Sequence, residues 1–141
     1  KSGRFQACIR QGLFNGFLVV FGERPYAEFE GDLPNLDFDL NGDEDFKLMQ
    51  SLKERGVPVV AVFLTGRPRG VDAAIELADA FVVAWLPGSE GAGVADVLMG
   101  DKNGRSQKNF KGRLPFSWPA DGAASPVINN AKYKPGHGLT Y

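Results

Sequence analysis

The chain has 141 residues, of which 43% are hydrophobic and 23% charged, as in ordinary globular proteins. This length suits one domain with a substantial core. The formal net charge of -1 argues against a nucleic-acid partner, and no apolar run reaches the ~20 residues of a membrane-spanning helix. The single cysteine, Cys8, excludes an internal disulfide, and no neighbouring feature marks it as reactive.

Short apolar runs alternate with helical patterns along the chain. The runs at 17–21, 57–64 and 80–86 predict strands that are buried on both faces of a parallel sheet. Apolar residues at helical spacing predict a helix over 45–56, with Asn41 or Asp43 as its cap and Gly56 as its stop. Shorter helices are expected over 72–78 and 92–99.

This alternation predicts one α/β domain: an open, mostly parallel, flavodoxin-like sheet with helices on both faces. The core should span 17–119, after a lead-in at 1–16 that shows no recognisable pattern. Two prolines in 113–119 favour an extended edge strand or strap there. Residues 120–141 are expected to be an irregular tail.

Ligands of open α/β sheets bind beyond the carboxyl ends of the strands, so the segments that follow the predicted strands are site candidates. These segments should gather five charged residues on one rim: Glu28, Glu30, Asp32, Arg67 and Glu90. From the residues alone, the three acids of the first segment are nearly equivalent candidates for chemistry. Tyr26 and Phe29 could shield Glu28 from water, which would favour the protonated form that a general acid needs.

Three other motifs give weaker signals. The glycine-rich stretch 88–93 lacks the Lys-Ser/Thr of a P-loop and the third glycine of a dinucleotide fingerprint, so a tight turn is favoured over nucleotide binding. Residues 37–42 match the first half of a calcium loop, but its twelfth position is Leu48 and not glutamate, and no metal site is expected. His137 is the only histidine and is expected at the surface.

Several long segments resemble glycoside hydrolase family 3, which comprises β-glucosidases and exo-β-glucan glucohydrolases. They lie in the same order as in the family, at 19–28, 56–68, 79–91, 110–119 and 138–141. The resemblance covers 17–119 and the last four residues. It is to the family's second domain, an α/β sandwich that packs against an N-terminal (β/α)8-type barrel. The chain is then expected to be the C-terminal portion of such an enzyme.

The resemblance implies a mechanism that retains anomeric configuration. An aspartate of the barrel attacks the anomeric carbon, and a glutamate in a Pro-Tyr-x-Glu motif protonates the leaving oxygen. That motif is 25–28 here, which selects Glu28 as the general acid/base. The implied substrates are β-glucosides or β-glucan oligosaccharides, with glucose removed from the non-reducing end. No cofactor is implied, and a secreted or periplasmic location is expected.

Roles are also expected for the residues near Glu28 and in the other loops of the rim. Substrate contacts are expected from Tyr26, Glu30 and Asp32, and structural roles in the loops from Arg67, Gly88 and Glu90, with Arg67 and Glu90 as an ion pair. Three positions depart from the family pattern: Arg69-Gly70 replace bulky apolar residues, and His137 replaces a common aromatic. Because the chain contains no barrel, it is expected to be inactive alone.

Two alternatives remain open at this point. One is a non-catalytic carbohydrate-binding or barrel-bracing module, which would not need Glu28. The other is a flavodoxin-like nucleotide-binding domain, which a nucleotide or flavin should stabilise.

Overall fold

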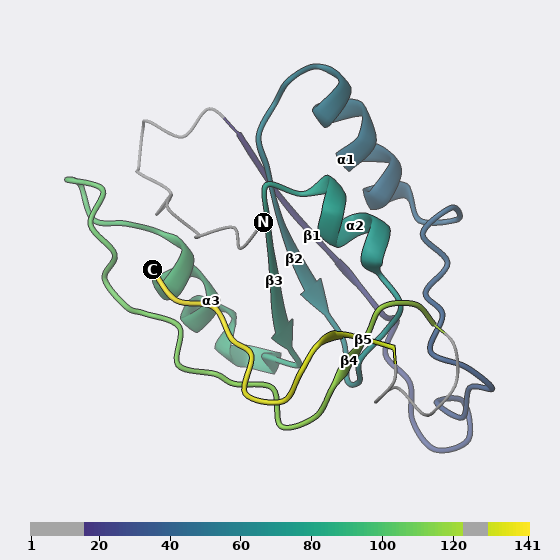
Figure 1. The fold of residues 1–141 in the computed structure, drawn as a ribbon. Coiled ribbons are helices and arrows are strands. Elements are labelled where there is room, and N and C mark those ends of the chain that lie inside the picture. Colours follow the sequence, from purple (N-terminus) through teal and green to yellow (C-terminus); the bar gives the residue numbers. More distant parts are fainter. Residues whose placement is uncertain (1–15, 123–129) are drawn as a thin grey trace.

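The computed structural model describes residues 16–122 and 130–141, which form a parallel sheet flanked by helices (Figure 1). Its strands lie in the order β1 (Phe17–Gly22), β2 (Val59–Leu64) and β3 (Ala80–Trp85). Residues 59–63 of the central strand are at most 4% exposed, which explains their continuous apolar run. The predicted α/β class and strands are confirmed. Cys8 and residues 1–15 of the lead-in lie outside the described residues.

Helices α1 (Glu44–Glu54) and α2 (Asp72–Leu77) cover one face of the sheet (Figure 1). The Asp43 side chain caps α1 by accepting a hydrogen bond from the Phe46 N–H at 2.8 Å. Beyond the helix, Gly56 adopts a φ of +71°, which favours glycine and ends the helix as predicted. The α1 residues at helical spacing are buried against the sheet: Phe46, Met49 and Leu52.

Helix α3 (Gly91–Leu98) follows a short 3-10 turn, η1 (Gly88–Glu90), and covers the opposite face. Leu98 packs there against Val62 and Val82, so helices lie on both faces as predicted. On this face, α3 does not cover β1. Leu18 and Val20, which alternate with buried residues of the same strand, are 45% and 49% exposed.

The C-terminal segments form a second, smaller sheet. β4 (Trp118–Pro119) pairs antiparallel with β5 (Ala131–Tyr133), so the extended segment at 113–119 is confirmed as a strap but does not join the main sheet. The expectation of an irregular tail over 120–141 is wrong for β5. The strap is also tied to the tail because the Leu114 N–H donates to the His137 carbonyl at 2.8 Å. Trp118 is 1% exposed and anchors the strap in the main core.

The remaining motifs have local structural roles. Asp39 closes a turn by accepting a hydrogen bond from the Gly42 N–H at 3.0 Å, and Asp37 bridges to Gly70. His137 is exposed and stacks on Tyr133 with ring centroids 4.2 Å apart. Within residues 16–122 and 130–141, no group of three or more His, Cys, Asp or Glu side chains could hold a metal. The helices of this part are too short or too polar to cross a bilayer.

Candidate active site at the carboxyl ends of β1 and β2

An open hollow of about 610 Å³ lies where β1 and β2 end. Its walls come from the segment after β1, the segment after β2, and the loop that leads into α1. The charged residues among its lining are Glu23, Arg24, Glu30, Asp39, Asp43, Arg67 and Arg69. The hollow therefore occupies the position at which open α/β sheets bind ligands.

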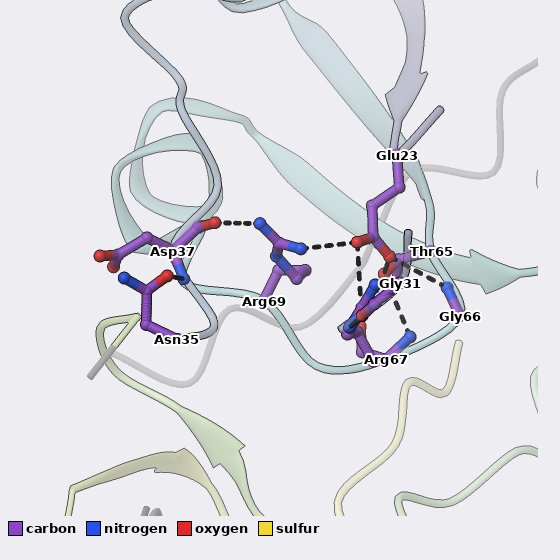
Figure 2. A network of polar contacts seen from close by, with 8 residues as sticks. All are labelled: Glu23, Gly31, Asn35, Asp37, Thr65, Gly66, Arg67 and Arg69. Atoms are coloured by element: carbon purple, nitrogen blue, oxygen red, sulfur yellow. Dashed lines mark hydrogen bonds and ion pairs between the residues drawn. The ribbon is translucent and has the colours of Figure 1, made fainter. Parts of the chain in front are cut away.

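Glu23, the first residue after β1, organises the floor of this hollow (Figure 2). Its Oε2 accepts a hydrogen bond from the Thr65 hydroxyl at 2.6 Å and from the Gly66 N–H at 3.3 Å. Its Oε1 accepts from Arg67 Nε at 3.2 Å and from Arg69 Nη1 at 2.6 Å. We call Glu23, Thr65, Arg67 and Arg69 the Glu23 cluster. The Glu23 side chain is only 8% exposed, so the hydrogen bonds that it accepts from Thr65, Gly66, Arg67 and Arg69 replace the water that burial removes.

The predicted ion pair between Arg67 and Glu90 is wrong, because Arg67 pairs with Glu23. The register of the sheet explains the choice. Gly22 pairs with Leu64, so the first residues beyond β1 and β2 meet side by side. Glu90 instead lies exposed in η1, where it lines a different hollow of about 450 Å³ beside β3.

Arg69 is the second cation of the cluster and is 7% exposed. Besides its bond to Glu23, its Nη2 donates to the Asp37 carbonyl, and its guanidinium lies 5.8 Å from the centroid of the Phe38 ring. Arg69 thereby joins the loop before α1 to the end of β1. An arginine fits at this buried position because Glu23 supplies the opposite charge.

The segment at 26–31, which contains Glu28, forms a compact turn above the cluster. The Gly31 N–H donates to the Ala27 carbonyl at 3.2 Å, and the Asp32 N–H donates to the Phe29 carbonyl at 3.0 Å. Arg67 lies over the Tyr26 ring at 4.4 Å and donates to the Gly31 carbonyl. The Arg67 guanidinium thus attaches the turn to the end of β2.

Glu28 itself is exposed, and no described residue forms a hydrogen bond or ion pair with its carboxylate. The expected shielding by Phe29 is wrong for this chain. Phe29 has a φ of 67° and is 83% exposed, because the turn directs it into solvent. Tyr26 packs on Arg67 instead.

The other predicted site residues lie in three places. Glu30 and Arg67 line the same hollow, whereas Asp32 is exposed and outside its lining. Gly88 begins η1 with a φ of +53°, a conformation that favours glycine in the turn after β3. Sequence reasoning missed three members of the Glu23 cluster: Glu23, Thr65 and Arg69. Part of the signal was available, since Thr65 comes directly after the predicted strand 57–64 and Glu23 lies two residues beyond the end of the predicted strand 17–21.

Comparison with known proteins places this geometry in a family. The family model described as the glycosyl hydrolase family 3 C-terminal domain matches residues 15–141. A lysosomal β-glucosidase of Dictyostelium discoideum is 39% identical over 104 residues, which are 72% of this chain and 12% of that protein. A periplasmic β-glucosidase of Salmonella typhimurium is 38% identical over 81 residues, 57% of this chain and 10% of that protein. The chain thus spans only about a tenth of the length of these curated relatives.

A solved structure shows the same fold. The exo-1,3/1,4-β-glucanase ExoP of a Pseudoalteromonas species superposes with a TM-score of 0.78 and 46% sequence identity, over 89% of this chain and 16% of that chain. The sequence resemblance is thereby confirmed along nearly the whole chain. This chain belongs to the C-terminal domain family of glycosyl hydrolase family 3.

Proposed function

We propose that this chain supplies the general acid/base, Glu28, of a retaining, exo-acting β-glucosidase or β-glucan glucohydrolase. The enzyme would remove glucose from the non-reducing ends of β-glucosides or β-glucan oligosaccharides without a cofactor. One observation carries the proposal: an exposed carboxylate without a described partner stands on a turn that is itself braced against the sheet. Such a carboxylate is available to a substrate held by another domain.

The chemistry needs a proton donor and a nucleophile on opposite sides of one bond. Glu28 would give its proton to the glycosidic oxygen as that oxygen leaves, while a second carboxylate attacks the anomeric carbon. Glu28 would then take a proton from the water that releases glucose. In retaining enzymes these two carboxyl groups lie about 5–5.5 Å apart.

The second carboxylate is proposed to come from outside this chain. Glu23 cannot serve, because its two oxygens already accept four hydrogen bonds in a buried site. We therefore assign the nucleophile to an aspartate of an N-terminal (β/α)8 barrel that packs against the rim carrying Glu28. The small share of each relative that this chain spans, 12% and 10%, leaves room for such a domain.

The names of the three relatives described above support the substrate class and the location. Two are β-glucosidases and one is an exo-1,3/1,4-β-glucanase, so these three have β-linked glucose in common. The two β-glucosidases are named lysosomal and periplasmic, which supports a secreted or periplasmic enzyme. Fractionation of the producing cells should find the full-length protein outside the cytoplasm.

The test is Glu28→Gln in the full-length enzyme. Loss of a general acid/base should lower kcat/KM for a β-linked glucose disaccharide by about 10²–10⁴-fold. Added azide should restore turnover of an aryl β-glucoside, because a small anion can attack the glycosyl-enzyme without a base. Glu30→Gln, two positions along the same turn, is the matched comparison, and azide should restore nothing in it.

A non-catalytic barrel-bracing or carbohydrate-binding module is the second candidate. It is favoured by the exposed apolar side chains on the same rim, Phe29 at 83% and Leu86 at 74%. Full turnover by Glu28→Gln would support this candidate and refute the first.

A further inference from the structure

We infer that Arg67 is a positioning residue for Glu28: it fixes the turn that carries this carboxylate, and Glu23 fixes Arg67. The inference rests on the proposed role of Glu28. It adds a residue that acts through the position of the proton donor.

The guanidinium of Arg67 makes three contacts in three directions. Its Nε donates to Glu23 at 3.2 Å, its Nη1 donates to the Gly31 carbonyl, and its face covers the Tyr26 ring at 4.4 Å. Tyr26 and Gly31 lie on either side of Glu28 in the chain. Arg67 therefore holds both ends of the segment whose middle bears the carboxylate.

Arg67 is itself held rigidly at the end of β2. Its N–H donates to the Thr65 hydroxyl at 3.2 Å, and that hydroxyl lies 2.6 Å from the Arg67 carbonyl and from Glu23 Oε2. Thr65 is 0% exposed, and the Arg67 side chain is 21% exposed. The turn, in contrast, is exposed from residue 26 to residue 30. The Arg67 side chain thus connects the buried end of the sheet to an exposed turn and restricts the position of that turn.

The slot for Tyr26 leaves little freedom in the position of the turn. A Cβ at Gly31 would lie 2.6 Å from the Tyr26 ring, and a Cβ at Gly66 would lie 2.7 Å from its hydroxyl. Two glycines and the guanidinium therefore contact one side of the ring, at distances that admit no methyl group at either glycine, while Tyr26 remains 41% exposed on its other side. Because Tyr26 is two residues from Glu28, this packing limits where the carboxylate can lie.

Loss of the contact should affect proton transfer more than any other step. A misplacement of about 1 Å in a catalytic group can cost about 10²-fold in rate. Such a loss depends on the leaving group. A sugar hydroxyl needs the proton of Glu28, whereas dinitrophenolate is a stable anion that leaves without protonation.

The experiment compares two substrates in the full-length enzyme carrying Arg67→Ala. We expect kcat/KM for a β-linked glucose disaccharide to fall about 10–100-fold, and that for 2,4-dinitrophenyl β-glucoside to change by less than about threefold. Arg67→Lys should recover part of the loss, since an ammonium can pair with Glu23 but cannot also cover Tyr26 and reach Gly31.

Asp79→Asn is the control for damage to the fold. Asp79 accepts hydrogen bonds from Lys53 and from the Val59 N–H, both at 2.7 Å, at the opposite end of the same strands. This variant should lower the unfolding temperature without changing the ratio of the two kcat/KM values.

The outcomes separate the inference from the function it rests on. An equal fall on both substrates in Arg67→Ala, or no fall on either, overturns the positioning role even when Glu28→Gln shows the selective loss. If Glu28→Gln lowers kcat/KM equally for the two substrates, or for neither, the proposed function fails instead.

Discussion

Glu23→Gln should destabilise the domain strongly, because it leaves Arg69 as a buried cation without its counter-ion. The two side chains are each 8% exposed and lie 2.6 Å apart. Breaking a buried pair by removing one partner costs about 3–5 kcal/mol. Glutamine keeps the shape and one carbonyl oxygen for the Thr65 or Gly66 donor, so we expect the lower end, about 3 kcal/mol. At a urea m-value of about 2 kcal/mol per molar, the midpoint should fall by about 1.5 M.

Urea unfolding followed by tryptophan fluorescence measures this shift, since Trp118 is 1% exposed and reports on the core. The surface pair between Lys53 and Asp79 is the matched comparison. The Asp79 side chain is 48% exposed, and exposed pairs contribute about 1 kcal/mol or less. A Glu23→Gln shift no larger than that of Asp79→Asn would refute the claim that a buried charge pair organises the site.

A double variant tests the cause of the loss. Arg69→Met in the Glu23→Gln background removes the buried cation as well. Since replacing both partners of a buried pair by uncharged groups is often neutral, most of the lost stability should return. No recovery would show that the hydrogen bonds of Glu23, and not the charge on Arg69, set the cost.

Three further outcomes are expected. Burial opposes ionisation of Asp79, but hydrogen bonds from Lys53 and the Val59 N–H outweigh it and lower the pKa of Asp79 below 3.8. The ionised carboxylate therefore stabilises the fold above that pH, and this stabilisation is lost in more acid solution. The urea concentration at the unfolding midpoint should decrease as the pH is lowered below about 4, and it should decrease less steeply in Asp79→Asn. Gly56→Ala should cost about 1 kcal/mol because its φ is +71°, whereas Gly91→Ala, at a φ of -54°, should be neutral or stabilising in the same urea assay. If the chain supplies only the acid/base, as proposed, the 141 residues alone should release no glucose from an aryl β-glucoside. Release that Glu28→Gln abolishes would contradict this.

The strands and helices could be predicted because their signals are local. The burial of β2 on both faces follows from its uninterrupted apolar run, and the start of α1 follows from Asp43 at its cap. The face that α1 buries follows from the spacing of residues 46, 49 and 52. Each of these signals lies within one element, so a single sequence contains all of it.

The features that the sequence did not reveal depend on pairing across the fold. Arg67 pairs with Glu23 and not with Glu90 because β1 lies beside β2 with Gly22 opposite Leu64. Neither segment by itself predicts that register. β5 was missed because its partner strand, β4, is distant in the chain. The direction of Phe29 was missed because a positive φ turns the side chain outward.

The partial cover of the sheet has a practical consequence. In the part of the chain that the structure describes, β1 is an edge strand, and its Leu18 and Val20 form an apolar strip beside backbone groups that no other strand pairs. Such an edge is a template for strand addition by a second molecule. We therefore expect this 141-residue chain, purified by itself, to self-associate through β1 as its concentration rises. A charged substitution such as Val20→Lys should keep it monomeric without touching the Glu23 cluster.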